Sequence, residues 1–392
     1  MIAVIVVITV AYQNNTKKNI PIVFSTKTMI DSIWQRYKDV YLEKDTYRTF
    51  DPDRGMVTTS EGEAYTLLRS VWLDDHVTFD KSWLWTKNNL QKKGYLFAWL
   101  FGKRSDGSYG ILTERNGQNS ASDADTDIGL SLALAFARWR DPQYLAAAKN
   151  IIVDVWNNEV IVIKGRPYLA ADNVQKRYTS DIVINPSYFS PYAYRIFAAI
   201  DPAHDWKGLV DTSYEVLRQS MRSPLELDST AGLPPNWIAI NRTDASIRVI
   251  SAQVAAQNLD TNFSYDALRI PWRIALDWYW YKEPRAKETL AALTFLDTEW
   301  KSKSALYAGY KHNGAPLVTV ETPAMYGGTI GTFMVTNPTE AKEVYENKLL
   351  FLYNPDSNSW KKQLSYYDDN WAWFGMALYN NELPNLWATV YK

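Results

Sequence analysis

The stretch from Ser122 to Trp139 constrains the fold of this chain more than any other. It opens with three carboxylates, Asp123, Asp125 and Asp127, and continues with apolar residues on nearly every side of a predicted helix. A helix without a polar face is normally buried on all sides. Ser122 can cap this helix with Asp125 as its capping-box partner, and the helix dipole favours acids in a first turn. Capping accounts for one or two of the acids, whereas a third adds like-charge repulsion at a buried end.

Composition limits the chemistry that the chain can perform. Its 392 residues carry a formal net charge of -1, which gives no indication of a nucleic-acid partner. Cysteine is absent, and the three histidines, His76, His204 and His312, lie far apart, so we expect no metal site. Catalysis must therefore depend on carboxylates, Tyr, Lys or Arg. Many of the 17 Trp and 26 Tyr residues must lie in the core, but such an excess also suits a groove that binds molecules with flat apolar faces and many hydroxyls.

The N-terminal segment, residues 1–24, begins with an apolar run from Met1 to Val10. This run is too short for a typical membrane span. It is similar to the apolar part of a secretion signal, although no basic residue precedes it and Thr9–Tyr12 is a poor cleavage site. A frayed or strand-like N-terminus is the alternative. We expect a signal or tether, and hence a secreted or periplasmic protein.

Helical patterns dominate residues 25–392, which we interpret as one all-α domain. Ser60 and Glu63 form a capping box at the start of one helix. Helices are predicted near residues 26–42, 60–72, 80–91, 122–139, 143–155, 191–200, 206–222, 271–281, 284–300, 339–351 and 370–381. Short strands are predicted near 160–168 and 247–252, and turn-rich connections at 224–237, 311–320 and 355–364. The helices come in pairs, and a closed ring of helical hairpins would explain helices that are apolar on every side.

Acids occur at or just before the start of three apolar helices. They are Glu61, Asp123 with Asp125, and Asp266, which lies on a turn before Pro271 and within reach of Arg269. Each acid alone is explained by capping or solvation. In a ring of hairpins, however, the inner helices run the same way, so their N-termini gather at one face. We therefore expect Glu61, Asp123 and Asp266 to share a single cleft.

Five ordered motifs resemble landmarks of glycoside hydrolase family 8. They cover nearly the whole chain, from about residue 30 to 380, and are Ser60-Glu61-Gly62, Ala121-Ser122-Asp123-Ala124-Asp125, Asn185-Pro186-Ser187-Tyr188-Phe189, Tyr265-Asp266-Ala267-x-Arg269-x-Pro271 and Tyr366-Tyr367-Asp368-Asp369-Asn370. The resemblance implies an (α/α)6 barrel that hydrolyses β-1,4-linked polysaccharides with inversion at the anomeric carbon.

The resemblance also assigns roles to the three acids. Glu61 would be the general acid, Asp266 the general base that activates water, and Asp123 the residue that holds and distorts the sugar at the cleavage point. An inverting pair needs carboxyl groups about 6.5–9.5 Å apart to admit the water. Arg269 would keep Asp266 ionised, and Asp123 would favour the protonated form of Glu61 by like-charge repulsion.

Further residues are expected to bind the substrate. Trp99, Tyr188, Tyr265 and Tyr367 are candidates for stacking on or hydrogen bonding to sugar rings, with core packing as the alternative for each. Asp125 and Arg269 are also expected to bind the substrate, whereas Trp139 and Trp272 are assigned to the core.

The resemblance implies a substrate class, namely cellulose, mixed-linkage glucan, xylan or chitosan. Asp266 argues against the chitosan-cleaving branch, and we expect an endo-β-1,4-glucanase that works as a monomer without a cofactor. A xylan-active enzyme is the first alternative, followed by a chitosanase and by a glycan-binding protein without catalysis. A polysaccharide lyase on a helical ring is disfavoured because no histidine centre is present.

Overall fold

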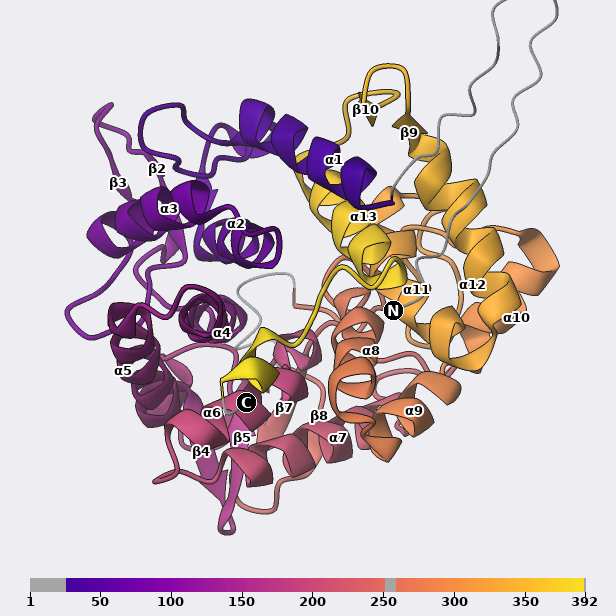
Figure 1. The fold of residues 1–392 in the computed structure, drawn as a ribbon. Coiled ribbons are helices and arrows are strands. Elements are labelled where there is room, and N and C mark those ends of the chain that lie inside the picture. Colours follow the sequence, from indigo (N-terminus) through magenta and orange to yellow (C-terminus); the bar gives the residue numbers. More distant parts are fainter. Residues whose placement is uncertain (1–25, 251–258, 391–392) are drawn as a thin grey trace, which may run out of the picture.

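The computed structural model describes residues 26–250 and 259–390, and helices dominate it (Figure 1). The predicted signal or tether, residues 1–24, lies outside the described residues, as do 251–258 and 391–392. Within the described part of the chain, none of the helices has the combination of length and apolar character that crossing a membrane requires. The expected single domain from residue 25 onward stays a prediction.

The helices form two concentric rings, which confirms the predicted (α/α)6 barrel (Figure 1). The inner ring consists of α2 (Ser60–Trp72), α4 (Ser122–Trp139), α6 (Pro191–Ile200), α8 (Arg269–Tyr281), α11 (Pro323–Thr336) and α13 (Tyr366–Tyr379). The outer ring consists of α1 (Thr26–Tyr41), α3 (His76–Asn89), α5 (Pro142–Glu159), α7 (Trp206–Arg222), α9 (Pro284–Ala291) with α10 (Thr294–Lys303), and α12 (Pro338–Val344). Each outer helix precedes an inner one in the chain, so the inner helices all run in the same direction.

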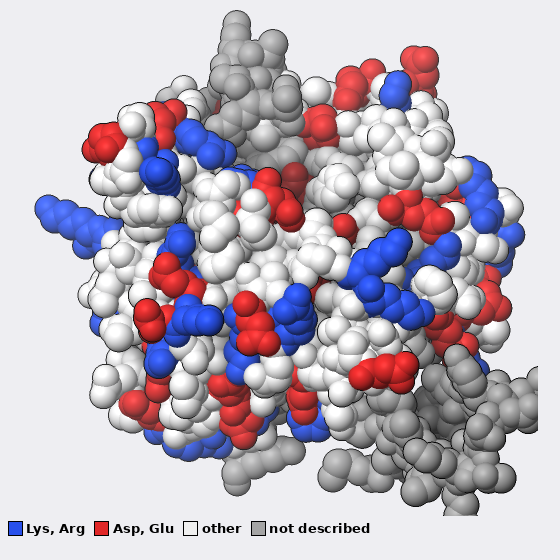
Figure 2. All heavy atoms as spheres, turned by 90° about the horizontal axis from the view of Figure 1, so that it is seen from above, with Lys and Arg blue, Asp and Glu red and all other residues white. Residues whose placement is uncertain are grey.

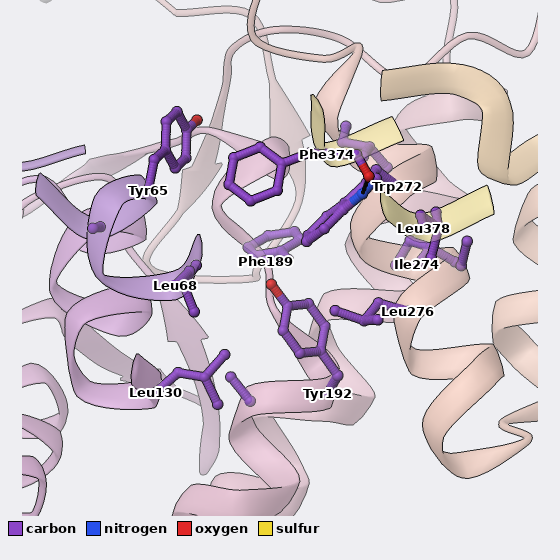
Figure 3. Packing of buried hydrophobic residues seen from close by; sticks show 14 of the residues in the cluster. Tyr65, Leu68, Leu130, Phe189, Tyr192, Trp272, Ile274, Leu276, Phe374 and Leu378 are labelled. Carbon is purple, nitrogen blue, oxygen red and sulfur yellow. Dashed lines mark hydrogen bonds between the residues drawn. The ribbon is translucent and has the colours of Figure 1, made fainter. Parts of the chain in front are cut away.

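The inner helices are buried because neighbours surround them on every side. Every residue of α2 except Glu61 is buried, and α4 leaves only Phe136, Arg138 and Trp139 incompletely covered. Aromatic rings fill the space inside the ring, where Trp272 packs edge-on against Phe374 at 5.3 Å between ring centroids (Figure 3). The Trp272 indole also donates to the Phe374 carbonyl, so it belongs to the core as predicted. Trp139 is only half-buried, stacked on His76 at the far end of α4.

One inner helix was not predicted from the sequence. Residues 323–336 form α11, although the segment contains Gly327, Gly328 and Gly331, which lower helix propensity. Packing against α8 and α13 stabilises the helix in place of propensity. A β-carbon at Gly327 would lie 1.8 Å from the Trp371 carbonyl oxygen. The glycines therefore serve close approach between inner helices, which a single-helix pattern does not reveal.

Other boundaries differ from the predictions by a few residues. Helix α8 begins at Arg269, so Pro271 is its third residue and not its first. The predicted helix over 284–300 is two helices, α9 and α10, and α13 begins four residues before the predicted start. Both predicted capping boxes are wrong: Thr59 caps α2 by accepting from the Gly62 amide, and α4 has no side-chain cap.

Two small antiparallel sheets lead into the inner helices. In the first, β1 (Thr58–Thr59), β2 (Leu100–Lys103) and β3 (Tyr109–Ile111) lie side by side, and β1 runs directly into α2. In the second, β6 (Asp181–Ile184) pairs with β7 (Ile238–Asn241), which pairs with β8 (Ile247–Arg248). Two hairpins complete the set, β4 (Val160–Ile163) with β5 (Arg166–Leu169) and β9 (Tyr353–Asn354) with β10 (Ser359–Trp360).

Candidate active site

The Arg269 guanidinium group binds all three acids that the sequence singles out. Its Nη1 donates to Oε2 of Glu61 at 2.5 Å and to Oδ2 of Asp123 at 3.1 Å, while Nη2 donates to Oδ1 of Asp266 at 2.8 Å. Glu61 and Asp123 lie in the first turns of α2 and α4, and Asp266 lies on the turn before α8. The predicted gathering of Glu61, Asp123 and Asp266 at one mouth of the ring is therefore what the structure contains.

The three carboxylates differ in their access to solvent. The side chains of Glu61 and Asp266 are 28% and 32% exposed, whereas Asp123 is 2% exposed. Glu61 and Asp266 bind different nitrogens of Arg269 and make no hydrogen bond to each other. Two carboxyl groups thus face the opening, one on each side of a shared guanidinium group, and the third lies beneath them.

Asp123 titrates unlike an ordinary aspartate. Burial raises its pKa to about 7; the Arg269 charge opposes this shift, and the Glu61 charge adds to it. Three carboxylates around one guanidinium group cannot all be neutralised by it, and like charges in one site disfavour full ionisation. The site therefore holds a proton more readily than three isolated acids would.

Asp266 has two more partners that the sequence did not single out as site residues. Asn185 Nδ2 donates to its Oδ1 at 3.1 Å, and the Trp237 indole Nε1 donates to its Oδ2 at 2.9 Å. Asn185 belongs to a recognised motif. Trp237 ends a turn-rich connection, and nothing in the local sequence indicates that it reaches residue 266.

Ser187 was also missed, although its motif was recognised. Its hydroxyl accepts from Arg269 Nη2 at 2.6 Å and donates to Asn185 Oδ1 at 2.7 Å. The hydroxyl thus links the guanidinium group to Asn185, so the two donors to Oδ1 of Asp266 are joined through Ser187.

Asp125 does not join this group. It is fully buried, and its Oδ1 accepts from the Phe97 amide at 2.8 Å. Its carboxyl group also shares a hydrogen bond with the carboxyl group of Glu159 on α5. Burial raises the pKa of Asp125 to about 7. Ser122, its predicted capping partner, donates instead to the Ala170 carbonyl at 2.7 Å. Asp125 therefore fixes the segment before Trp99 from below, without facing the opening.

The four predicted aromatic residues differ in how closely they approach the acids. The Arg269 guanidinium lies over the Tyr188 ring at 5.3 Å, and Tyr265 and Tyr367 meet edge to face at 5.7 Å. Tyr265 is 52% exposed and is thus free to contact a ligand. Trp99 is half-buried next to the start of α2, where its carbonyl accepts from the Ser60 amide at 3.1 Å. The Trp99 indole itself donates to the Asn116 carbonyl at 2.9 Å. Burial raises the pKa of Tyr188 and of Tyr367, and the charges of Glu61 and Asp266 add to both shifts, so these two rings lie near both partly exposed carboxyl groups.

A second ion pair supports the first from one helical turn below. Arg273 follows Arg269 by four residues on α8, and Asp127 follows Asp123 by four residues on α4. The two form a bidentate pair with contacts of 2.9 and 2.7 Å, and both side chains are almost completely buried. The Ser190 and Tyr192 hydroxyl oxygens also accept from Nη1 of Arg273, at 2.6 and 2.9 Å. The repeated spacing fixes the relative height of α4 and α8.

The described residues contain no group of three or more His, Asp or Glu side chains placed to hold a metal ion. On the face that Figure 2 draws, acidic and basic side chains are interspersed without one large patch of either sign. Such a surface matches the near-zero net charge and favours neutral ligands over polyanions.

Comparison with known proteins adds a family to this geometry. The model of the glycosyl hydrolases family 8 matches residues 8–378. Endoglucanase C of Ruminiclostridium cellulolyticum is 30% identical over 334 residues, which cover 81% of this chain and 65% of that protein. The chain thus spans about two-thirds of the length of this relative.

Two solved structures share the fold. A β-1,3-1,4-glucanase from Paenibacillus sp. X4 superposes with a TM-score of 0.74 at 21% identity, covering 91% of this chain and 92% of the other. A GH8 xylobiose complex from Teredinibacter turnerae superposes with a TM-score of 0.70 at 19% identity, covering 92% and 94%. Both similarities concern the arrangement of the helices.

Proposed function

The chain belongs to the glycosyl hydrolases of family 8, and we propose that it is an inverting endo-β-1,4-glucanase. One observation carries the proposal: Arg269 holds Glu61, Asp123 and Asp266 together at one mouth of the ring. A relative named endoglucanase that is 30% identical supports a glucan as the substrate. Xylan is the alternative, because a xylobiose complex has the same fold.

In the proposed reaction, Glu61 donates a proton to the glycosidic oxygen as the bond to the anomeric carbon breaks. Asp266 takes a proton from a water molecule that attacks this carbon from the opposite face of the sugar ring. To act as the acid, Glu61 leaves Arg269 when the substrate enters and carries a proton. Asp123, beneath both groups, holds sugar hydroxyls at the cleavage point.

The arrangement of the acids supports an inverting enzyme. A water molecule must fit between the base and the sugar, so inverting enzymes keep their two carboxyl groups about 6.5–9.5 Å apart. Glu61 and Asp266 bind opposite nitrogens of one guanidinium group, which keeps them close without contact. The aromatic rings of Trp99, Tyr188, Tyr265 and Tyr367 would line the sugar subsites on either side.

The test is a pair of matched substitutions on α2. Glu61→Gln should abolish hydrolysis of carboxymethylcellulose. Glu63→Gln changes the same side chain two residues away, where it points to Thr49 and Thr86, and should leave activity intact. Anomeric NMR of fresh product should show inversion. Near wild-type activity of Glu61→Gln, or retention at the anomeric carbon, would contradict the proposal.

Substrate and location need separate measurements. Initial rates on cellulose, mixed-linkage glucan, xylan and chitosan should be highest on a glucan. We propose that the protein is exported, with residues 1–24 as the signal or tether, and that it acts as a monomer. Fractionation of the producing cells and the mass in solution would test these two points.

A further inference from the structure

The two carboxyl oxygens of Asp266 have different surroundings. Oδ1 accepts two hydrogen bonds, from Arg269 Nη2 at 2.8 Å and from Asn185 Nδ2 at 3.1 Å. Oδ2 accepts one, from the Trp237 indole at 2.9 Å. A carboxylate oxygen has two lone pairs, so Oδ1 is fully engaged and Oδ2 has one lone pair left. Only Oδ2 can accept another proton without losing a bond.

From this difference we infer that Trp237 is a positioning residue, which fixes Oδ2 of Asp266 as the oxygen that deprotonates the attacking water. The inference rests on the proposed function, in which Asp266 is the general base. Because the indole N–H occupies one lone pair of Oδ2, it leaves the other pointing in one direction. A base that is held in this way needs no rotation before it takes the proton.

The second sheet, β6–β7–β8, positions both the Asn185 amide and the Trp237 indole, which donate to Asp266. Strands β6 and β7 are antiparallel with Ile184 opposite Ile238, so the next residues outward, Asn185 and Trp237, leave the sheet side by side. One of them binds Oδ1 and the other binds Oδ2. The pairing of two strands thus sets the orientation of the carboxyl plane, and a shift in register would separate the two donors.

Trp237 itself is held firmly at this position. Its amide donates to the Asp260 carbonyl at 3.0 Å, and its ring meets the Tyr188 ring edge-on at 5.8 Å. Tyr188 in turn lies under the Arg269 guanidinium at 5.3 Å. The indole N–H is therefore one part of a connected group of side chains that contacts both oxygens of Asp266.

The step balances in protons and bonds. The proton of the attacking water moves to Oδ2 of Asp266, while the water oxygen bonds to the anomeric carbon. The bond from that carbon to the glycosidic oxygen breaks, and this oxygen takes the proton of Glu61. Trp237 keeps its own proton throughout and only orients the acceptor.

The experiment replaces the indole donor and measures kcat and KM on carboxymethylcellulose across pH. Trp237→Phe removes the donor, and Trp237→Met is a second donor-free variant in case the smaller ring unsettles the loop. Trp237→His restores a donor, because imidazole superposes on the five-membered ring of indole with Nε2 in place of Nε1. The matched control is Trp139→Phe. Trp139 Nε1 also donates to an aspartate, Asp74, at 2.8 Å, but Trp139 lies at the C-terminal end of α4, away from Asp123 and the site.

We expect Trp237→Phe to lower kcat by about tenfold to a hundredfold, the usual effect of losing a partner that orients a reacting group. The acidic limb of the pH profile of its kcat should move to higher pH, because the loss of a hydrogen-bond donor to a carboxylate favours the protonated form of that carboxylate. Trp237→His should recover most of kcat and restore the limb, and Trp139→Phe should change neither quantity.

Three outcomes would overturn the inference. The first is an unchanged kcat and pH profile in the donor-free variants. The second is a rise in KM alone, which would make Trp237 a sugar-binding residue only. The third is a Trp237→His variant that is as slow as Trp237→Phe. Asp266→Asn separates this inference from the proposed function. If Asp266→Asn keeps its activity, the proposed function fails; if it is inactive while Trp237→Phe is normal, only the role of Trp237 fails.

Discussion

Nη1 of Arg269 lies 2.5 Å from Oε2 of Glu61, although 208 positions separate the two residues in the chain. Their helices, α8 and α2, are opposite members of the inner ring, with α4 and α6 between them on one side and α11 and α13 on the other. The contact therefore crosses the mouth of the ring and joins two inner helices that are not neighbours. The same side chain that gathers the acids thus also ties opposite sides of the barrel together.

Replacing Arg269 should cost stability as well as activity. Removing one partner of a buried ion pair leaves an uncompensated charge, here Asp123 at 2% exposure, and typically costs about 3–5 kcal/mol. We expect Arg269→Met to lose about that much in urea unfolding. Arg269→Lys should lose less, because a charge remains, but Lys cannot bind three acids at fixed angles. Equal stability of the wild type and Arg269→Met would show that the acids are neutral in the fold.

The sequence made the main parts of this site predictable for a local reason. An acid next to the start of an apolar helix is visible in a few residues, and a ring of parallel inner helices brings such starts together. Arg269 was within reach of Asp266 because it follows Asp266 by only three positions. Trp237 reaches Asp266 because β6 and β7 pair, and Ser187 reaches Arg269 from the short segment after β6. No local sequence pattern specifies which distant residue such a segment contacts.

Glu63 is predicted to make stability depend on pH. It is fully buried, with Oε1 accepting from the Thr49 amide at 2.7 Å, and burial raises its pKa to about 8. The Thr86 hydroxyl lies 3.0 Å from Oε2 and 2.8 Å from the Ser82 carbonyl, and it has one proton to give. A protonated Glu63 donates to Thr86, which then donates to Ser82, so both bonds are satisfied.

The sign follows from the direction of the shift. The folded protein keeps this proton up to about pH 8, whereas the unfolded chain loses it near pH 4.5. Stability from Glu63 is therefore complete below pH 4.5 and is lost as pH rises toward 8. The loss is on the order of 3–5 kcal/mol, at about 1.4 kcal/mol per pKa unit. Glu63→Gln keeps an acceptor for Thr49 and a donor for Thr86, so its unfolding free energy should fall less between pH 5 and 8. Parallel pH curves for the two proteins would refute the assignment.

The pair below the site should behave as a coupled unit. Asp127 and Arg273 are buried and bidentate, so Asp127→Asn and Arg273→Met should each destabilise by about 3–5 kcal/mol. The double variant leaves no buried charge, and it should lose less than the sum by about 1–3 kcal/mol. The more exposed pair Asp297 and Lys301 is the control, and its two single losses should simply add. Additive losses at Asp127 and Arg273 would mean that the two side chains do not interact.

The fold was predictable where burial on every side erased the polar face of a helix, as in α4. It was not predictable at α11, where Gly, Pro and Thr residues lower helix propensity and neighbouring helices supply the stability. The capping boxes failed for a related reason. Ser60, Glu63, Ser122 and Asp125 match the capping pattern, but Glu63, Ser122 and Asp125 bind other segments of the chain.

The glycines of α11 give the sharpest test of inner-ring packing. A β-carbon at Gly327 would lie 1.8 Å from the Trp371 carbonyl oxygen on α13, and one at Gly375 would lie 2.4 Å from the Gly327 α-carbon. Backbone cannot move aside as a flexible side chain can, so Gly327→Ala must push α11 and α13 apart. Overpacking of this kind costs about 1–3 kcal/mol or more.

Gly129 in α4 is the matched control, because its β-carbon would meet only side chains at 3.4 Å and beyond. Gly129→Ala should be neutral or stabilising by up to about 1 kcal/mol, since alanine is the better helix former. Thermal and urea unfolding of the two variants should therefore shift in opposite directions or differ by several kcal/mol. If Gly327→Ala were as stable as Gly129→Ala, α11 and α13 would not lie as close as their glycines allow.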